Sequence, residues 1–377
     1  MAIQNAFTLT ANEVFKTLAN MIISQEVFAD NLGKHQTLVD KARVDGGLFG
    51  DTKLYYATDA NKSYEWGNDA EAENLLKLDR PQDPKVQAIK LDKFRQIRLT
   101  IDNYLTKRGF ATEGAFASFN SVMLGWMKET KQMYDGTLYN VFVGTTETNV
   151  GKQIVNVDIT TATTGLTGVE KEQMEAMVIA QKLANLFVEM GDYSRDFNDY
   201  GFLRSYANEN IRLVWNASYI NKIRKIDTPT IFHRDGLVDK FDEDIMPERY
   251  FGRDLVEDDF GAGKVIGADG AYDSTKGTLR AKAEFDYNNK HYFPGDALAI
   301  SGTYVGVVGG LEASMVYLEE ADVICKVLVK LPPYMSAFEV GSSFYNPRSL
   351  TENHYLTWGY NTLDYLKNYP FITVKAI

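Results

Sequence analysis

Apolar residues recur at helical spacing in three stretches of this chain. Thr10-Ala-Asn-Glu13 is a capping-box pattern followed by apolar residues at three- and four-residue steps, which predicts a short N-terminal helix. The longest pattern predicts a helix over Thr112–Asp135 that Gly136 ends. A second capping box, Thr167-Gly-Val-Glu170, opens a helix for which Gly191 is a suitable end. The apolar stripe of the longest helix consists of Phe116, Phe119, Met123, Trp126 and Met133 or Tyr134.

Strand-like patterns occupy much of the remaining chain. Leu138–Ile159 is rich in Thr and Val, Ile211–Trp215 alternates as a strand does, and Ala217–Ile226 predicts a short helix. Asp227–Asn289 is rich in glycine and acidic residues and predicts a long loop region. The end of the chain, Ser343–Val374, is rich in Tyr, Thr and Trp and predicts long strands. Shorter strands are expected at Ala297–Ile300, Thr303–Val308, Ala313–Tyr317 and Asp322–Leu331. The mixture predicts an α+β fold with interleaved subdomains.

A charged, turn-broken stretch at Gly46–Tyr104 has no core of its own. Asp51–Asp79 carries seven acidic residues against three basic ones, and Arg80–Arg108 carries eight basic residues against three acidic ones. Two extended limbs of about 20 residues would reach ~65 Å, yet an isolated two-stranded ribbon is marginally stable in water. We therefore expect the stretch to contact another copy of the chain, although its two limbs could also pair within one hairpin. Strand-like runs lie at Lys53–Thr58 and Gln87–Ile101.

The composition is that of an ordinary globular protein with an acidic balance. The chain has 377 residues, of which 45% are hydrophobic and 24% charged. The formal net charge of −11 argues against a nucleic-acid reader, because phosphate binding needs a basic face. A protein that lies near nucleic acid without binding it tightly remains compatible with this charge.

Cys325 is the only cysteine, so an intrachain disulfide and a thiolate metal cluster are both impossible. Its strand-like surroundings favour a buried, inert thiol over a reactive nucleophile. Met1–Thr10 lacks the features of a secretory signal, and no apolar run approaches the length of a membrane span. We therefore expect synthesis and folding in a reducing cytoplasm, with no membrane partner.

The sequence holds no motif that predicts catalysis, a cofactor or a metal. Gly261-Ala-Gly263-Lys264 fails as a phosphate loop, because Asp258 and Val265 stand where such a loop needs Gly and Ser or Thr. The densest carboxylate cluster predicts a solvated acidic loop, since its spacing does not fit a calcium loop. A divalent-ion site or a glycosidase-like acid pair is the alternative for these carboxylates. The cluster consists of Asp239, Asp242, Glu243, Asp244 and Glu248. The four scattered histidines, which do not pair at metal-ligand spacing, are His35, His233, His291 and His354.

Aromatic residues make up 12% of the chain, and several lie in segments that predict no compact core. Tyr and Trp are enriched at interfaces, where one end of the side chain is buried and the other is hydrogen-bonded. The alternative is that the aromatic residues near the end of the chain pack one face of a sheet. The relevant residues are Tyr55, Tyr56, Tyr64, Trp66, Tyr355, Trp358, Tyr360, Tyr365 and Tyr369.

The order of these parts resembles the major capsid protein of tailed bacteriophages, whose fold is named after phage Hong Kong ninety-seven. The resemblance covers the whole chain as an order of elements, and its local texture is closest to the capsid proteins of small phi29-like podoviruses. The stretches that carry it are Lys90–Tyr104, Ala115–Tyr139 and Asn210–Ile226. It implies a structural protein, not an enzyme, that assembles with itself as pentamers and hexamers into an icosahedral virion capsid around double-stranded DNA.

The resemblance also implies a division into domains. Residues 1–48 would be the N-terminal arm and residues 49–100 the extended loop. Residues 101–165, with the spine helix, and residues 334–377, as returning strands, would form the peripheral domain. Residues 166–333 would form the axial domain.

Two features of relatives bear on partners and chemistry. Some relatives begin with a scaffolding segment, but here the arm begins at Met1, so the resemblance implies a separate scaffolding protein, together with a portal, in the host bacterial cytoplasm. Some relatives cross-link a loop lysine to an asparagine. Lys53 and Lys62 lie in the corresponding region, but no Asn or acid is marked as a partner, so this chemistry is not expected.

Four residues of the charged stretch are predicted to contact neighbouring subunits: Tyr64, Trp66, Arg95 and Arg98. Opposite charges on the two limbs would give such contacts register and specificity. Reversing Arg95 and Arg98 to Glu is therefore expected to impair assembly more than folding. The alternatives for the whole chain are an encapsulin-type nanocompartment shell, which shares the fold, and a glycan-binding or carbohydrate-active protein.

Overall fold

The computed structural model divides the chain into two compact units, which are described separately. Unit 1 consists of Met1–Asp51, Lys90–Gly136 and Tyr334–Thr362, and unit 2 consists of Thr52–Ile89, Thr137–Pro333 and Leu363–Ile377. The structure describes residues 38–45, 52–63, 80–102, 113–225, 242–259, 276–298 and 312–377. The expected N-terminal helix and the strand expected at Thr303–Val308 lie outside these residues.

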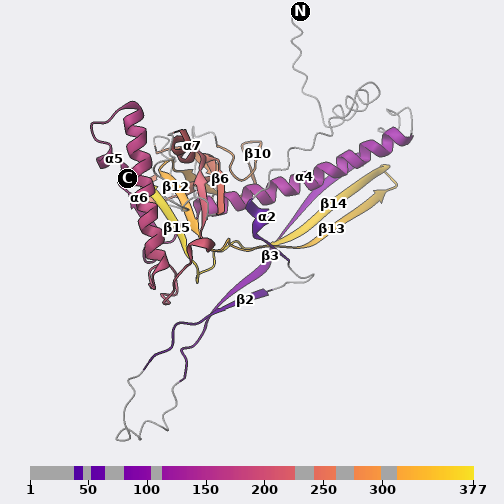
Figure 1. Ribbon diagram of the computed structural model, residues 1–377. Coiled ribbons are helices and arrows are strands. Elements are labelled where there is room, and N and C mark those ends of the chain that lie inside the picture. Colours follow the sequence, from indigo (N-terminus) through magenta and orange to yellow (C-terminus); the bar gives the residue numbers. More distant parts are fainter. Residues whose placement is uncertain are drawn as a thin grey trace, which may run out of the picture. The chain divides into compact units, whose positions relative to one another are not determined.

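Unit 1 is built on a ribbon of long antiparallel strands (Figure 1). β13 (Tyr334–Asn346) and β14 (Thr351–Asn361) form a hairpin, and β14 also pairs with β3 (Lys85–Asp102). β1 (Arg43–Asp45), which follows α2 (Leu38–Ala42), pairs in parallel with the first three residues of β13. The strand order in unit 1 is β1-β13-β14-β3, and β2 (Thr52–Ala57) lies in unit 2. Long strands near the end of the chain and strands on both limbs of the charged stretch are thus confirmed.

The longest helix does not end at Gly136, contrary to the sequence prediction. α4 spans Glu113–Thr145, so Leu138–Thr145 is helical and only Ile154–Val157 (β4) of the expected strand region is a strand. A glycine inside a helix costs only about 1 kcal/mol relative to alanine. Burial of Tyr139, Val141 and Val143, which are 0%, 1% and 0% exposed, outweighs this cost.

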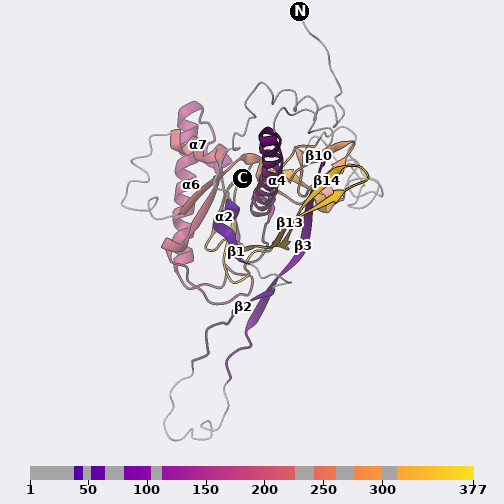
Figure 2. The same ribbon diagram turned by 90° about the vertical axis from the view of Figure 1, so that its right-hand side faces the viewer.

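Unit 2 has a five-stranded sheet in the order β4-β15-β12-β5-β6. Its core strands are β15 (Phe371–Ala376), β12 (Val323–Leu328) and β5 (Arg212–Asn216), and every side chain of β12 is buried. Figure 2 shows α6 (Gly168–Gly191) and α7 (Ala217–Lys225) on one side of the sheet. Apolar residues of both helices join the strands in one core cluster. The predictions of this helix pair, of β5 and of a buried Cys325 are confirmed.

Smaller elements complete the described part of unit 2. A three-stranded sheet has the order β7-β11-β8, and β9 pairs with β10 in a hairpin. Ala313–Tyr317 was expected to be a strand, but Ala313–Met315 forms the 3-10 turn η5 and the strand begins at Val316. Ala297 makes only an isolated bridge to Arg280. The remaining elements are α5 (Ile159–Ala162), η2 (Asn208–Asn210), β6 (Asp242–Met246), η3 (Glu248–Tyr250), β7 (Gly252–Arg253), η4 (Glu257–Asp259), β8 (Leu279–Ala281), β9 (Phe285–Tyr287), β10 (Lys290–Tyr292) and β11 (Val316–Glu319).

The two compact units divide the chain at other places than the expected domains. β15 pairs with β12 and β4 in unit 2, while β13 and β14 belong to unit 1. The assignment of capsid domains to particular residue ranges stays a prediction.

Candidate functional site

The outer half of β13 lies beyond the packed part of unit 1. Residues 339–345 are all exposed, and Val340, Phe344 and Tyr345 have exposed fractions of 43%, 60% and 48%. β1 covers the edge of β13 only at residues 334–336 among the described residues. An exposed edge strand offers backbone donors and acceptors to another strand. The outer half of β13 therefore has the features of a surface that another chain completes.

The strand register places a mixed polar and aromatic row on one face of the ribbon, which we call the open face. Thr100 lies opposite Asn353, and Asn353 lies opposite Phe344, so the three side chains share this face. Thr100 Oγ1 donates a hydrogen bond to Asn353 Oδ1 at 2.6 Å. Residues of β3 on the open face are Phe94, Gln96, Arg98 and Thr100.

Arg98 lies in this row, exposed, and is held by neighbouring polar groups. Its Nε donates to Gln96 Oε1 at 2.8 Å, and Gln96 Nε2 donates to Thr357 Oγ1 at 3.0 Å. At the inner end of the row, Phe94 is 58% exposed and its ring lies over Gly359, where a Cβ atom would stand 2.9 Å from the ring. The glycine leaves room for the Phe94 ring to lie against the strand.

Arg95 points to the opposite face of the ribbon and packs within unit 1. Its guanidinium lies 4.6 Å from the centroid of the Tyr134 ring on α4. The buried Trp358 contacts the same ring edge-on at 5.9 Å, and the hydroxyls of Tyr134 and Tyr360 are 2.8 Å apart. Arg95 and Arg98, which the sequence grouped together, thus lie on different faces. Tyr64 and Trp66 lie outside the described residues.

A buried carboxylate fixes α4 to β13 within unit 1. Asp135 is 0% exposed and accepts hydrogen bonds from Tyr334 Oη at 2.6 Å and Lys131 Nζ at 3.2 Å. Burial, and then the Asp135 charge, raise the pKa of Tyr334 well above its usual range, so its hydroxyl stays a donor. Lys131 Nζ also lies 3.2 Å from Glu339, at the start of the exposed half of β13. This network holds the base of the ribbon firmly.

Groups that could have supported catalysis have structural partners instead. Asp242 and Asp244 lie on β6 and pair with Arg212 on the adjacent strand, so this part of the acidic cluster is not a solvated loop. His291 Nε2 lies 2.9 Å from Glu284 Oε1, and His291 Nδ1 lies 2.7 Å from Asp286 Oδ1. The hydrogen bond with Asp286 is the main cause of the raised pKa of His291. Among the described residues, no three acidic, His or Cys side chains group as metal ligands, and no helix is long and apolar enough to cross a bilayer.

Cys325 lies in the middle of β12 and is 0% exposed. Burial raises the pKa of its thiol far above the usual value. A protonated, covered thiol is a poor nucleophile, which agrees with the inert role that the sequence suggested.

Comparison with known proteins identifies the fold. No family model and no curated protein matches the sequence. The structure is similar to a chain in the capsid structure of Staphylococcus phage Andhra, with a TM-score of 0.58 and 11% identity, covering 94% of this chain and 89% of that one. It is also similar to a chain in the structure of the head fibre and inner core protein gp22 of native bacteriophage P68, with a TM-score of 0.56 and 11% identity, covering 93% and 88%. The chain has a Hong Kong ninety-seven-like α+β fold, as expected from the sequence.

Proposed function

We propose that this chain is the major capsid protein of a tailed bacteriophage, and that it assembles as pentamers and hexamers into an icosahedral shell around double-stranded DNA. The observation that carries the proposal is the likeness in fold, over 94% of the chain, to a capsid structure of a Staphylococcus phage. Both similar structures come from phages, which favours a virion shell over a cellular compartment.

The ribbon of unit 1 supports a role in assembly. Its outer half exposes apolar side chains and, among the described residues, a strand edge without a partner strand, while its base is held by the buried Asp135 network. A closed shell repeats one interface many times, so each copy of the interface can be modest in strength. A ribbon whose base is held within the chain and whose outer half is exposed fits such a repeated contact.

The charge of the chain fits a container for DNA. A net charge of −11 gives no general attraction to phosphate, so packaged DNA would stay free to move. In this proposal the chain performs no chemistry and needs no cofactor. Its partners are copies of itself, a separate scaffolding protein and a portal, and assembly takes place in the host bacterial cytoplasm before the chain becomes part of the virion.

Electron microscopy of the purified full chain tests the proposal. The chain would be expressed alone and, where its genome encodes a scaffolding protein, together with that protein, and imaged over a range of concentrations. We expect pentamers, hexamers or closed shells. A chain that stays monomeric under all of these conditions would overturn the proposal.

A shortened variant tests the charged stretch separately. Deleting Asp51–Arg98 would also remove β3 residues that pair with β14, so the better change replaces residues 60–84 with a short Gly-Ser turn. We expect a folded protein, shown by circular dichroism and a cooperative melt, that forms no shells. Shells indistinguishable from those of the parent chain would show that the stretch is dispensable.

A further inference from the structure

Both limbs of the charged stretch are tied down where they leave the body of unit 2. From here on, the arm means residues 52–89, not the N-terminal arm expected at residues 1–48. On its outgoing limb, Asp59 lies 2.6 Å from Arg195 Nη1 and accepts a hydrogen bond from the Leu203 amide at 2.9 Å. The Asp59 side chain is only 6% exposed. Arg204 donates to the carbonyl of the adjacent Thr58.

The return limb is tied by an amide side chain. Gln87 is 8% exposed, and its Nε2 donates to the Tyr365 carbonyl at 2.8 Å and to Asp364 Oδ2 at 3.2 Å. Its Oε1 accepts from the Lys367 amide at 3.0 Å. Both the nitrogen and the oxygen of the Gln87 side-chain amide are therefore bonded to residues 364–367.

The loop that receives the outgoing limb is itself braced. Ser194 and Arg204 exchange two backbone hydrogen bonds of 2.9 Å. Inside the loop, Asn198 donates to the Phe202 carbonyl and accepts from the Phe202 amide, both at 2.8 Å. A loop closed in this way presents Arg195 and the Leu203 amide in fixed directions.

The two receiving segments are also joined to each other. The Asp199 amide donates to the Lys367 carbonyl at 2.9 Å, and Gln153 donates to Asp199 Oδ1 at 2.7 Å. Gln153 in turn accepts from the Phe371 amide at 2.8 Å, at the start of β15. The anchor points of the outgoing and return limbs thus belong to one connected piece of unit 2.

The direction of the arm has a large effect on where its tip lies. A group about 30 Å from a pivot moves by about 5 Å when the direction of its support changes by about 10°, and about 5 Å is the spacing of two neighbouring strands. An arm that must contact a neighbouring subunit in a single register therefore needs a firmly held base.

We propose that residues 192–206 and 363–368 form a clamp that sets the direction of the arm, and that Asp59 and Gln87 are its positioning residues. This inference rests on the proposed function, because a second copy of the chain is the partner that the arm would reach. The clamp acts before assembly, within one subunit. Loss of the clamp leaves the fold of unit 2 in place and lets the arm swing.

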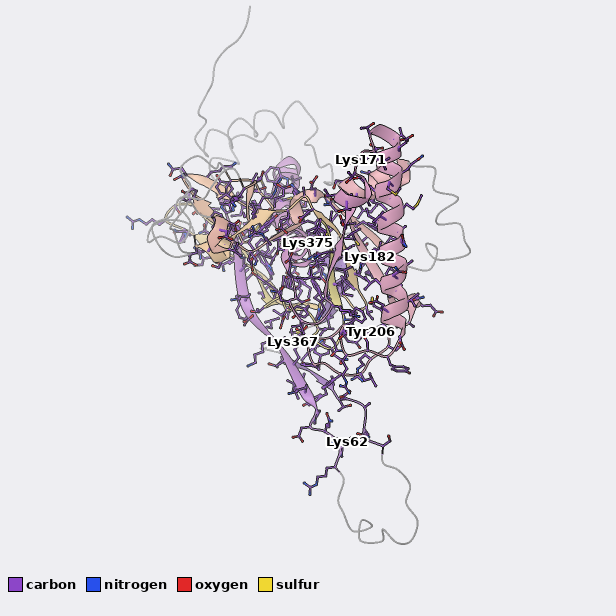
Figure 3. All side chains as sticks on the ribbon, turned by 90° about the vertical axis from the view of Figure 1, so that its left-hand side faces the viewer. Lys62, Lys171, Lys182, Tyr206, Lys367 and Lys375 are labelled. Carbon is purple, nitrogen blue, oxygen red and sulfur yellow. The ribbon has the colours of Figure 1, made fainter. Side chains whose placement is uncertain are left out.

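Spin labels measure the swing directly in the unassembled full chain. Lys62 on the arm and Lys182 on α6 are exposed and both belong to unit 2 (Figure 3). The variants Lys62→Cys and Lys182→Cys would carry the labels, and the buried Cys325 stays unlabelled. We expect a narrow distance distribution in the parent chain and one at least twice as wide after Asp59→Asn with Gln87→Ala. Equal widths in the two proteins would overturn the clamp.

Two further variants distinguish loss of the clamp from misfolding. Asp83→Asn makes the same charge change at an exposed position of the return limb and is expected to leave the distribution narrow. Arg195→Gln removes the Asp59 ion pair from the exposed side of the clamp and is expected to widen the distribution. Amide hydrogen exchange at Leu203 and Lys367 should rise about tenfold with the loss of their acceptors, at an unchanged melting temperature.

Assembly is then compared by electron microscopy. We expect the clamp variants to give shells of irregular curvature or a several-fold higher protein concentration for assembly. A widened distance distribution with normal shells would show that the clamp does not position the arm for its partner, while the capsid proposal stands. Failure of the parent chain to assemble would count against the capsid proposal, and the label distances would still decide whether the clamp exists.

Discussion

Two of the described strands differ sharply in how completely the chain covers them. Every side chain of β12 in unit 2 is buried, and the strand has β15 and β5 as neighbours on its two edges. The outer half of β13 in unit 1 is exposed at residues 339–345 and pairs only with β14 among the described residues. β12 is completed within one chain, whereas β13 has the properties of a strand that other copies complete. Stability and assembly should therefore depend on different strands.

The largest expected effect comes from the completed strand. Leu328 is 0% exposed at the end of β12, and Leu328→Ala should lower the free energy of unfolding by about 2–5 kcal/mol through lost burial and a cavity. Urea unfolding followed by fluorescence measures the change. Val340→Ala on β13 is the matched control and should change the value by less than about 0.5 kcal/mol. Comparable losses in the two variants would remove the distinction between the strands.

A buried lysine should make the completed sheet sensitive to pH. Lys326 is 0% exposed and donates to the Thr146 carbonyl and Thr373 Oγ1, each at 2.8 Å. Burial lowers its pKa to about 7, against the influence of nearby Glu147 and Glu320 and with that of Lys375. Between pH 7 and 10.5 the unfolded chain binds a proton that the folded chain does not, so stability rises with pH in this window.

The variant Lys326→Met isolates this contribution. Relative to the variant, the parent chain should gain stability on the order of 3–5 kcal/mol between pH 7 and pH 10. Urea midpoints at several pH values measure the gain, and the difference between the two proteins cancels groups that titrate in both. Parallel pH profiles would mean that Lys326 stays charged in the folded sheet.

Charge reversal on β3 separates the two faces of the ribbon. Arg95→Glu loses the contact with the Tyr134 ring and should cost about 0.5–2 kcal/mol of stability. Arg98→Glu, on the open face, should cost less than about 0.5 kcal/mol and still impair assembly. Melting curves and light scattering measure the two effects. If Arg98→Glu assembles normally, the open face carries no contact at that position.

The smallest effect on stability is expected at Phe344, whose side chain is 60% exposed. Phe344→Ser should leave the free energy of unfolding unchanged within about 0.5 kcal/mol, because most of the side chain lies outside the chain's own core. We expect assembly, followed by light scattering, to be strongly reduced. Ser342→Ala on the same face is the control and should assemble as the parent does. Normal assembly of Phe344→Ser would leave β13 without a function in the shell.

Local patterns were sufficient for much of the fold. The alternation of Ile211–Trp215 and the apolar stripe before Gly191 predicted β5 and α6, because both contribute apolar side chains to the same core. The helix does begin after Thr167, although the Thr167 side chain makes no capping hydrogen bond. At Gly136 the pattern failed, since burial of the following turn is a tertiary effect that local propensity does not contain.

The contacts at the base of the arm were beyond the reach of sequence patterns. Asp59 and Arg195 are 136 residues apart, and Gln87 and Tyr365 are 278 residues apart. Asp59 lies just outside a predicted strand and Gln87 begins another, and neither position indicates a distant partner. Arg95 and Arg98 could be chosen from their charge, but the register with β14 and the position of Tyr134 decide which of them is exposed. The sequence indicated only that Phe344 lies in an aromatic stretch predicted to form a strand, and not that its side chain is exposed.

The reaction rate of the single thiol, at Cys325, can report how often the sheet around it opens. Because its sulfur lies at the centre of the most completely covered strand, a disulfide reagent can reach it only when that sheet separates. The rate of labelling at high reagent concentration then approaches the rate of opening itself. Measured in free subunits and again in assembled particles, that rate would report how far assembly slows the escape of a subunit from its native state.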